Sequence, residues 1–422
     1  MDRTVRRFRR SSRVIALGAV ATLAVGACGM GAQGQPSAAS ASVSMEAASA
    51  AAAPEGSGAA ATMLATLIAA AAPPTAPSNP QAAGAVASAP RAPAWIAVPR
   101  IAGRLTNRDI GLVINSADPY SVEVGEFYIR ARKLQPEQVL RVDLPVRATL
   151  SADEFRAFDR RLTAHFGPAV QALALAWVQP YAVACNSLTA ALAIGFDDEL
   201  CHKSCDPPLR HSPYFNSTST RPYADLGLRP SMLLAADDVA GAKAMITRGV
   251  SSDSTLGQRG APPVNAYYVI TPDRARSSRA SLFPPPGQVA KIGIDVHVER
   301  ASWLEDVDRV LLYMTGAVKV DKLDRIGWVP GAMADHLTSF GGVLDGHGGQ
   351  MTAKAWIASG ATASYGTVSE PCSYPQKFPH PQVLLLHYAQ GSTVIEAYWK
   401  SVAWPQQGVF IGEPLAAPFA RR

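Results

Sequence analysis

The chain has 422 residues, of which 48% are hydrophobic and 17% are charged, with 39 Lys and Arg against 33 Asp and Glu. Six of the basic residues and one acidic residue precede Cys28, so the chain from Cys28 onward carries 33 basic and 32 acidic residues, a net charge of +1. This balance excludes a strongly basic nucleic-acid-binding protein, and no nucleic-acid partner is expected.

Residues 1–27 are predicted to be an export signal. Six arginines precede Val14–Val25, an apolar run that is too short to span a bilayer. Val25-Gly26-Ala27-Cys28 resembles a bacterial lipoprotein box, in which Cys28 is lipidated and becomes the mature N-terminus. The alternative is ordinary cleavage after Ala27, which leaves Cys28 as a free thiol. The prediction is an exported protein, periplasmic or held at the outer membrane, whose membrane attachment is this lipid anchor alone.

Residues 28–94 are predicted to be a linker and residues 95–422 an α/β domain. Ala, Ser, Pro and Gly dominate the linker, and charges are almost absent from it, so it cannot build a core. The remaining segment exceeds three hundred residues, which is ample for a large hydrophobic core.

Strand and helix signals alternate in the first part of the predicted domain. Asp118-Pro119 is a natural helix start, and Ser151 with Glu154 forms a capping box. The expected strands are Gly111–Asn115, Gln138–Leu144 and Ala169–Trp177, and the expected helices are Ser121–Lys133 and Ser151–His165. Strands and helices that alternate with short joins predict right-handed crossovers and a parallel sheet.

The segment 182–230 reads as an irregular excursion that contains cysteines. After a helix at Ser187–Phe196, turn-forming residues dominate it. A disulfide among Cys185, Cys201 and Cys205 is the expected use of these thiols, since export leads to an oxidising compartment. Zinc held by Cys201, Cys205, His202 and His211 is the alternative, but the spacing is not a standard zinc signature. We expect no metal, and no cofactor either, because nucleotide-binding and His-Glu-x-x-His motifs are missing.

Strand and helix signals continue to the C-terminus. The expected strands are Asn265–Ile270, Lys291–Val298, Val310–Met314, Ala361–Val368 and Gly408–Gly412, and the expected helices are Asp237–Arg248, Lys354–Ser359 and Leu384–Val402. Small and β-branched residues in Gly360–Cys372 suit the middle of a parallel sheet, and Pro371 stops its ladder. The sequence therefore predicts a three-layer α/β fold with a mostly parallel sheet and a disulfide-bearing insertion.

Several sequence motifs, most of them in the C-terminal half, resemble those of a known family. They are Asp335-His-Leu-Thr-Ser-Phe-Gly-Gly, Glu396-Ala-Tyr-Trp-Lys-Ser and Gly412-Glu-Pro-Leu-Ala-Ala-Pro-Phe, together with the Tyr128–Arg132 segment. They resemble an uncharacterised family of exported bacterial proteins from genomes that carry exosortase, the proposed membrane sorting transpeptidase. The resemblance covers nearly all of Ile110–Phe419. It implies a cell-envelope protein linked to exosortase-type sorting of surface proteins or polysaccharides, and it brings no established activity.

A more distant resemblance is to gingipain-type cysteine peptidases, which have a caspase-like α/β fold. It is carried by Glu396-Ala397, by Gly412-Glu413-Pro414 and by the strand that begins Gly360-Ala361. Those peptidases have His-Gly after one strand and Cys after the next, so that the imidazole holds a thiolate. This chain has Thr315-Gly316 and Ser339 at those places. The resemblance therefore implies a degenerate peptidase-like module that binds a peptide or a glycan.

Two constellations would instead make the protein an active hydrolase. His347, in a glycine-rich turn, and Cys372, at the end of a strand, could form a replacement dyad. Otherwise His347 is a loop residue and Cys372 is oxidised or inert. Asp335, His336 and Ser339 have the chemical types of a serine hydrolase and would share a face if residues 332–339 were helical. Capping and hydrogen bonding are the alternative use of these three residues.

Glu370 and the ends of the strands define the expected site. Glu370 could act as a general acid or base, or it could form an ion pair with Lys377 that fixes the loop. Ligands bind at the carboxyl ends of strands in open α/β sheets. If those strands are neighbours, one pocket collects Asn115, Thr315, His336, Ser339, Tyr365, Thr367 and Glu370.

Overall fold

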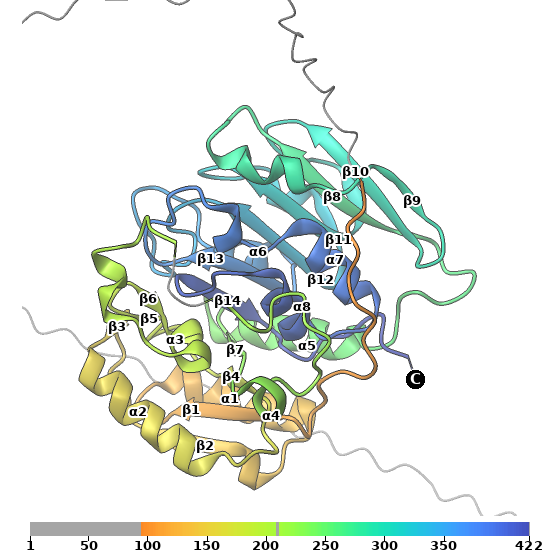
Figure 1. The fold of residues 1–422 in the computed structure, drawn as a ribbon. Helices are drawn as coiled ribbons and strands as arrows, with labels where there is room; N and C mark the ends of the chain where they lie inside the picture. Colours follow the sequence, from red (N-terminus) through yellow and green to blue (C-terminus); the bar gives the residue numbers. More distant parts are fainter. Residues whose placement is uncertain (1–93, 208–210, 422) are drawn as a thin grey trace, which may run out of the picture. The chain divides into compact units, whose positions relative to one another are not determined.

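An eleven-stranded mixed sheet flanked by helices lies at the centre of residues 94–207 and 211–421, the part of the chain that the computed structural model describes (Figure 1). Its strands lie side by side in the order β2 (Val139–Val142), β1 (Ile110–Asn115), β4 (Ala172–Leu175), β7 (Ser231–Leu233), β14 (Gly408–Gly412), β13 (Ala363–Thr367), β12 (Ile326–Leu337), β11 (Val307–Gly316), β8 (Val264–Ile270), β10 (Ile294–Arg300) and β9 (Gly287–Val289). The predicted α/β fold with a mostly parallel sheet is confirmed. The predictions for the export signal, for Cys28 and for the linker up to residue 93 lie outside the described residues.

Helices connect the strands, and local sequence explains where most of them begin. The helices are α1 (Pro119–Arg132), α2 (Ala152–His165), α3 (Leu188–Ile194), α4 (Pro222–Leu226), α5 (Val239–Ser252), α6 (Lys354–Ser359), α7 (Pro381–Ala389) and α8 (Val394–Ser401). The Asp118 side chain accepts a hydrogen bond from the backbone N–H of Tyr120 at the start of α1. Ser151 and Glu154 form the predicted capping box at α2. Both helix starts were therefore readable from local sequence.

The segment 182–230 contains more regular structure than the sequence suggested. A short strand, β5 (Ala182–Val183), pairs with β3 (Thr149–Leu150) on one side and with β6 (Asn186–Ser187) on the other, in a separate small sheet. The segment also holds α3, α4 and a disulfide between Cys185 and Cys201. Part of this predicted excursion is therefore tied to the body of the domain by strand pairing.

β14 divides the sheet into two groups of strands, and contacts beyond the strand ends show at which edge of the sheet each group ends. β13 is parallel to β12 and antiparallel to β14, while β14 meets β7 through one parallel pair, a ladder too short to define a direction. Tyr181, which follows β4, donates to Asp345, which follows β12. Lys354, beyond β12, pairs with Asp237, beyond β7, at 3.0 Å. The strands on both sides of β14 therefore end at one edge of the sheet, which we call the carboxyl edge.

The structure does not have the helix considered for residues 332–339, nor the single helix predicted for Leu384–Val402. Residues 332–339 are not helical, because β12 continues through Leu337 between β11 and β13, where both of its faces are buried. Leu384–Val402 is not one helix but two, α7 and α8. Gly391 adopts a φ of +99° between them, and a capping box of Thr393 and Glu396 starts the second helix. Residues 332–339 form a strand because they are buried between two other strands. Leu384–Val402 is interrupted because a second helix cap at Thr393 was not recognised in the sequence.

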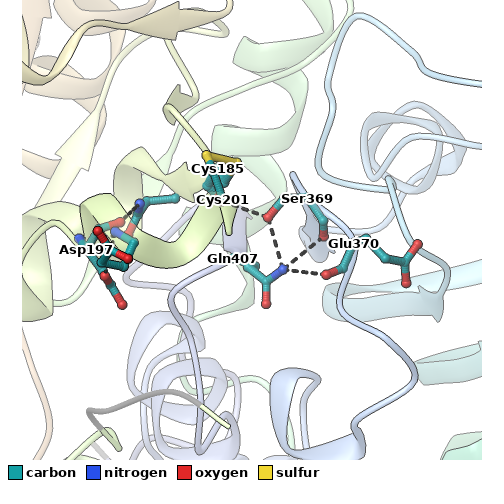
Figure 2. Close-up of a disulfide and its surroundings, with 8 residues drawn as sticks. Cys185, Asp197, Cys201, Ser369, Glu370 and Gln407 are labelled. Carbon is teal, nitrogen blue, oxygen red and sulfur yellow. Dashed lines mark hydrogen bonds between the residues drawn. A yellow bond between two sulfur atoms is a disulfide. The ribbon is translucent and has the colours of Figure 1, made fainter. Parts of the chain in front are cut away.

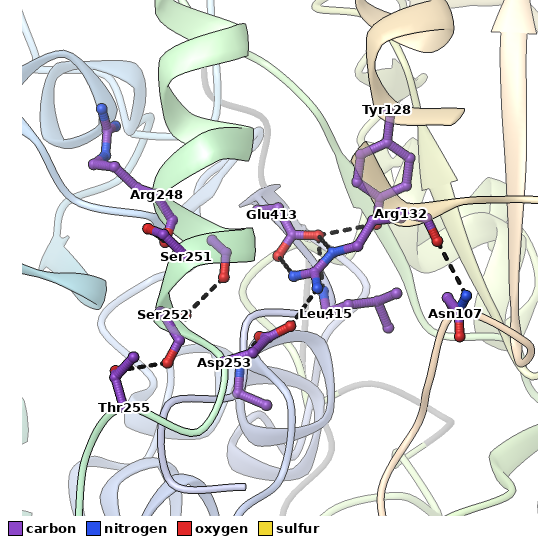
Figure 3. Close-up of polar contacts among 12 residues, drawn as sticks. Asn107, Tyr128, Arg132, Arg248, Ser251, Ser252, Asp253, Thr255, Glu413 and Leu415 are labelled. Atoms are coloured by element: carbon purple, nitrogen blue, oxygen red, sulfur yellow. Dashed lines mark hydrogen bonds and ion pairs between the residues drawn. The ribbon is translucent and has the colours of Figure 1, made fainter. Parts of the chain in front are cut away.

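A buried ionic cluster joins three distant segments of the chain (Figure 3). Arg132, at the end of α1, donates through Nε and Nη2 to both carboxylate oxygens of Glu413, at 2.9 and 2.5 Å. Its Nη1 lies 2.5 Å from a carboxylate oxygen of Asp253, which follows α5. Tyr128 donates its hydroxyl to Glu413 at 3.0 Å. The Tyr128–Arg132 segment and the Gly412-Glu-Pro motif are therefore in contact, and this contact holds the C-terminal segment against α1.

Candidate functional site

The carboxyl edge beyond β11, β12 and β13 holds most of the predicted site residues, but not Asn115. Three strands separate β1 from β13 in the sheet. At about 4.8 Å per strand, the two are roughly 19 Å apart. The Asn115 side chain instead donates to the carbonyl oxygen of Leu144 at 3.0 Å and accepts from its N–H at 2.9 Å. The predicted pocket that includes Asn115 is therefore wrong, because its strand is not a neighbour of the others.

A buried ion pair fills the space where β11 ends. Arg279 donates through Nη2 to the Thr315 carbonyl oxygen at 2.8 Å and to a carboxylate oxygen of Asp335 at 2.5 Å. Both charged side chains are 1% exposed. Burial raises the pKa of Asp335, and the charge of Arg279 and its hydrogen bond oppose that rise. Thr315 therefore contributes to a closed polar core and not to an open pocket.

The 3₁₀-helix η3 (Arg276–Leu282) covers the end of β11 directly. A Cβ atom added at Gly316 would overlap the backbone carbonyl of Arg276, so only glycine fits there. The Arg276 side chain continues across the edge, with its Nε 3.2 Å from the hydroxyl of Thr338. Close packing of η3 therefore accounts for the glycine in Thr315-Gly316.

His336 is held by hydrogen bonds on both ring nitrogens. Trp356 donates its indole N–H to Nδ1 at 2.9 Å, and Nε2 lies 2.9 Å from the carbonyl oxygen of Met351. The ring is therefore neutral, with its proton on Nε2. Burial lowers the pKa of His336 to about 4. An imidazole bonded in this way has no free nitrogen with which to act as a general base.

The proposed serine hydrolase geometry is also absent from this edge. Asp335 and His336 are consecutive in a strand, so their side chains point to opposite faces of the sheet. Ser339 lies in the turn after β12, where its carbonyl oxygen accepts from the hydroxyl of Thr367 at 2.8 Å. The hypothesis that these residues share a helical face is wrong, because the segment is a strand.

The buried histidines make the protein sensitive to acid. His387 is fully buried like His336, and burial together with the charge of Lys400 lowers its pKa to about 4. Since the usual value is 6.5, the unfolded chain takes up protons first as the pH falls, so stability is lost between pH 6.5 and 4. We expect a loss of about 2–3 kcal/mol per histidine.

Denaturant unfolding at neutral pH and near pH 4.5 measures this effect. His336→Gln and His387→Gln should each reduce the pH dependence, whereas the exposed His347→Gln should leave it as it is. An equal pH dependence in all four proteins would contradict the assignment.

Cys372 is joined to Cys205 by a disulfide and so is not a free thiol. The ring of His347 packs against that of Phe340, with the centroids 4.4 Å apart. The hypothesis of a Cys372–His347 dyad is therefore wrong in this structure. The predicted disulfide among the three excursion cysteines is confirmed for Cys185 and Cys201. The pairing of Cys205 with Cys372 was not anticipated.

Glu370 is an exposed loop residue and forms no ion pair with Lys377 in the described part of the chain. One of its carboxylate oxygens accepts from the backbone N–H of Cys372 at 2.8 Å. Lys377 is buried and donates to the carbonyl oxygen of Ser204. Burial lowers the pKa of Lys377 to about 8, although the charges of Glu370 and Asp206 oppose this. The predicted latch is therefore replaced by a bond from Lys377 to the excursion.

Hydrogen bonds around the Cys185–Cys201 disulfide bring the excursion to the end of β13 (Figure 2). Ser369 donates its hydroxyl to the carbonyl oxygen of Cys185 at 2.7 Å. Gln407 donates its amide to the Ser369 hydroxyl at 3.0 Å and to the Glu370 carbonyl oxygen at 2.7 Å. The excursion, the β13 loop and the start of β14 therefore form one connected surface.

Aromatic side chains form a further feature of this surface that the sequence analysis missed. The ring of Trp404 lies 5.5 Å from those of both Tyr374 and His211, between centroids. Tyr374 and Trp404 are partly exposed and His211 is exposed. We call these three residues the aromatic cluster. Each of two loops has an aromatic residue directly before a proline, Tyr374-Pro375 and Trp404-Pro405. Nothing in the sequence showed that these two loops lie together.

Metal sites and membrane-spanning helices are both absent from residues 94–207 and 211–421. Across these ranges, no group of three or more His, Cys, Asp or Glu side chains is arranged to hold a metal ion. Nor does any helix within them have the length and apolar character needed to cross a bilayer.

Comparison with known proteins identifies no relative of this chain. No family model, no curated protein and no solved structure matches it.

Proposed function

We propose that the protein is an exported envelope module that binds a peptide or a glycan and has lost the chemistry of the gingipain-type peptidases it resembles. In this proposal Cys28 carries the lipid anchor, and the protein serves an exosortase-type surface-sorting pathway. Mass spectrometry of the mature N-terminus tests the anchor independently of binding. The fold we propose is a three-layer, caspase-like one with a disulfide-bearing insertion.

The observation that carries the proposal is the closed polar core where β11 and β12 end. These strands are neighbours, with Thr315 opposite His336. In our proposal they take the place of the strands that bear His-Gly and Cys in the peptidases that the sequence resembles. Here Arg279 bonds to the Thr315 carbonyl oxygen, and η3 covers Gly316. Trp356 and Met351 occupy both nitrogens of the nearby imidazole. Such an arrangement supports a stable scaffold in place of a nucleophile and base.

The aromatic cluster is the surface that suits a peptide or glycan best. Aromatic rings offer a large contact area at small entropic cost, and polar neighbours can orient the ligand. Lys377 Nζ lies 5.3 Å from the centroid of the Tyr374 ring. The exposed carboxylate of Glu370 belongs to the same loop. This surface therefore combines rings and an exposed carboxylate next to the Cys205–Cys372 disulfide, with the buried amine of Lys377 close to the Tyr374 ring.

Tyr374→Ala and Trp404→Ala should each weaken binding to cell-wall sacculi, or to a peptide library, by about tenfold, the effect of losing one stacked ring. Cosedimentation measures binding to sacculi, and retention on immobilised peptides measures binding to the library. Trp303→Ala is the matched control, since Trp303 is 37% exposed and lies outside the aromatic cluster. Unchanged binding in both cluster variants would contradict the proposed surface.

The claim that hydrolysis is absent is tested separately. Fluorophosphonate and iodoacetamide probes should label neither Ser339 nor Cys372 in the folded protein. Labelling of Ser339 that disappears in Ser339→Ala would overturn the proposal in favour of a hydrolase.

A further inference from the structure

A continuous hollow lies on the face where the chain enters the described residues. Three adjoining cavities of about 840, 450 and 300 Å³ make it up. Ile292 lines all three, and Phe419 lines the first two. The walls come from residues 98–104 of the entering segment (residues 94–104), the end of α7, the loops at 254–264 and 290–293, and the C-terminal segment. We call this feature the basic hollow.

The charged side chains that line the basic hollow all have one sign. They are Arg100, Arg104, Arg259, Lys291 and Arg421. Among the residues that the structure describes, no Asp or Glu lines any of the three cavities. None of these five cations forms an ion pair with another described residue, although the described chain contains thirteen such pairs elsewhere, from Arg132–Asp253 to Lys354–Asp237. Unpaired charges of one sign around a concavity attract an anion.

The remaining lining mixes apolar side chains with the polar ones of Ser254, Gln258 and Gln390, and the apolar part is larger in the first cavity. It includes Val98, Ile101, Leu256, Leu386 and Phe419. Phe419 is held in place by packing on Tyr388, with ring centroids 6.0 Å apart. A concavity lined by both apolar side chains and cations suits an anion that carries a hydrocarbon part better than it suits a free inorganic ion.

The entering segment is fixed to the domain and exposes apolar side chains. Gln382 in α7 accepts from the backbone N–H of Ile96 at 2.8 Å, and Gln390 just beyond α7 accepts from that of Ile101 at 3.3 Å. Figure 1 shows this orange segment beside α7 and near the C-terminal end. Trp95 and Ile96 remain 38% and 36% exposed. Tryptophan is enriched where proteins meet the headgroup layer of a membrane.

We propose that the basic hollow binds the phosphate-bearing headgroups of anionic phospholipids, so that this face of the domain docks on a membrane. The interaction is independent of acylation at Cys28, and it neither requires nor excludes a ligand at the aromatic cluster. It would hold the domain in one orientation, with the entering segment turned toward the bilayer and the carboxyl edge left accessible.

Vesicle cosedimentation of the full-length mature chain carrying Cys28→Ser tests this proposal, because the acyl anchor is then absent. The protein should bind vesicles of phosphatidylcholine mixed with phosphatidylglycerol and should not bind vesicles of phosphatidylcholine alone. Binding should weaken as salt is raised. Arg100→Gln/Arg104→Gln/Lys291→Gln should lower the affinity about a hundredfold, as expected for three headgroup contacts.

Arg130→Gln/Arg160→Gln/Arg300→Gln is the control, since it removes the same charge from exposed cations that line none of these cavities. It should bind nearly as well as the parent. Equal losses in the two triple variants, or equal binding to both kinds of vesicle, would overturn the proposal. So would binding of inorganic phosphate at the same three residues without vesicle binding, because the site would then serve a soluble anion. Five of the six substituted residues are exposed and Arg104 is half-buried. Melting temperatures equal to that of the parent will show that both triple variants fold.

Discussion

Replacing Cys205 and Cys372 together with serine is expected to lower the free energy of unfolding by about 5 kcal/mol, on the chain-entropy estimate for a loop of this length. The disulfide closes a loop with a sequence separation of 167 residues, so it removes many conformations from the unfolded chain. It also holds the excursion against the loop that follows β13. Denaturant unfolding of the parent and of the double variant, both without reductant, measures the difference.

The second disulfide provides the matched comparison. Cys185 and Cys201 are separated by only 16 residues, so the corresponding double serine variant should lose about 3 kcal/mol. A larger loss from the short loop than from the long one would contradict the argument from loop length.

We also expect the Cys205/Cys372 variant to weaken ligand binding at the aromatic cluster, because Tyr374 lies two residues beyond Cys372.

Arg132→Met is expected to lower the free energy of unfolding by about 3–5 kcal/mol, the cost of leaving a buried charge without its partner. Glu413 is fully buried, and Arg132 supplies two of its hydrogen bonds (Figure 3). Removal of the guanidinium also leaves Asp253 without its ion pair. Urea unfolding of the variant and of the parent measures the loss.

Two further variants distinguish loss of pairing from loss of volume. Arg132→Met/Glu413→Met removes both charges and should recover much of the stability, because apolar replacements of a buried pair are tolerated. Arg141→Met breaks an exposed pair with Glu126 and should cost less than about 1 kcal/mol. If the Arg132 and Arg141 variants lost the same stability, burial would not be the reason for the effect.

Local sequence determined much of the secondary structure of this protein. The alternation of strand and helix signals, the cap at Asp118 and the capping box at Ser151 are interactions between residues close in the chain. The predicted strand Ala361–Val368 ends within one residue of β13, whose ladder stops at Thr367, four residues before Pro371. These features follow from short-range chemistry, so the sequence alone predicts them.

Only the tertiary structure decided what the carboxyl edge contains. Residues 332–339 have a helical spacing, but pairing with β11 and β13 makes them a strand, and this separates Asp335 from His336. The sequence left open whether Cys372 is a reactive thiol or is oxidised, because its partner, Cys205, lies 167 residues away. His336 looked like a base because Trp356 and Met351 approach it only in the folded chain. Contacts between residues far apart in the chain depend on strand order, which local patterns do not specify.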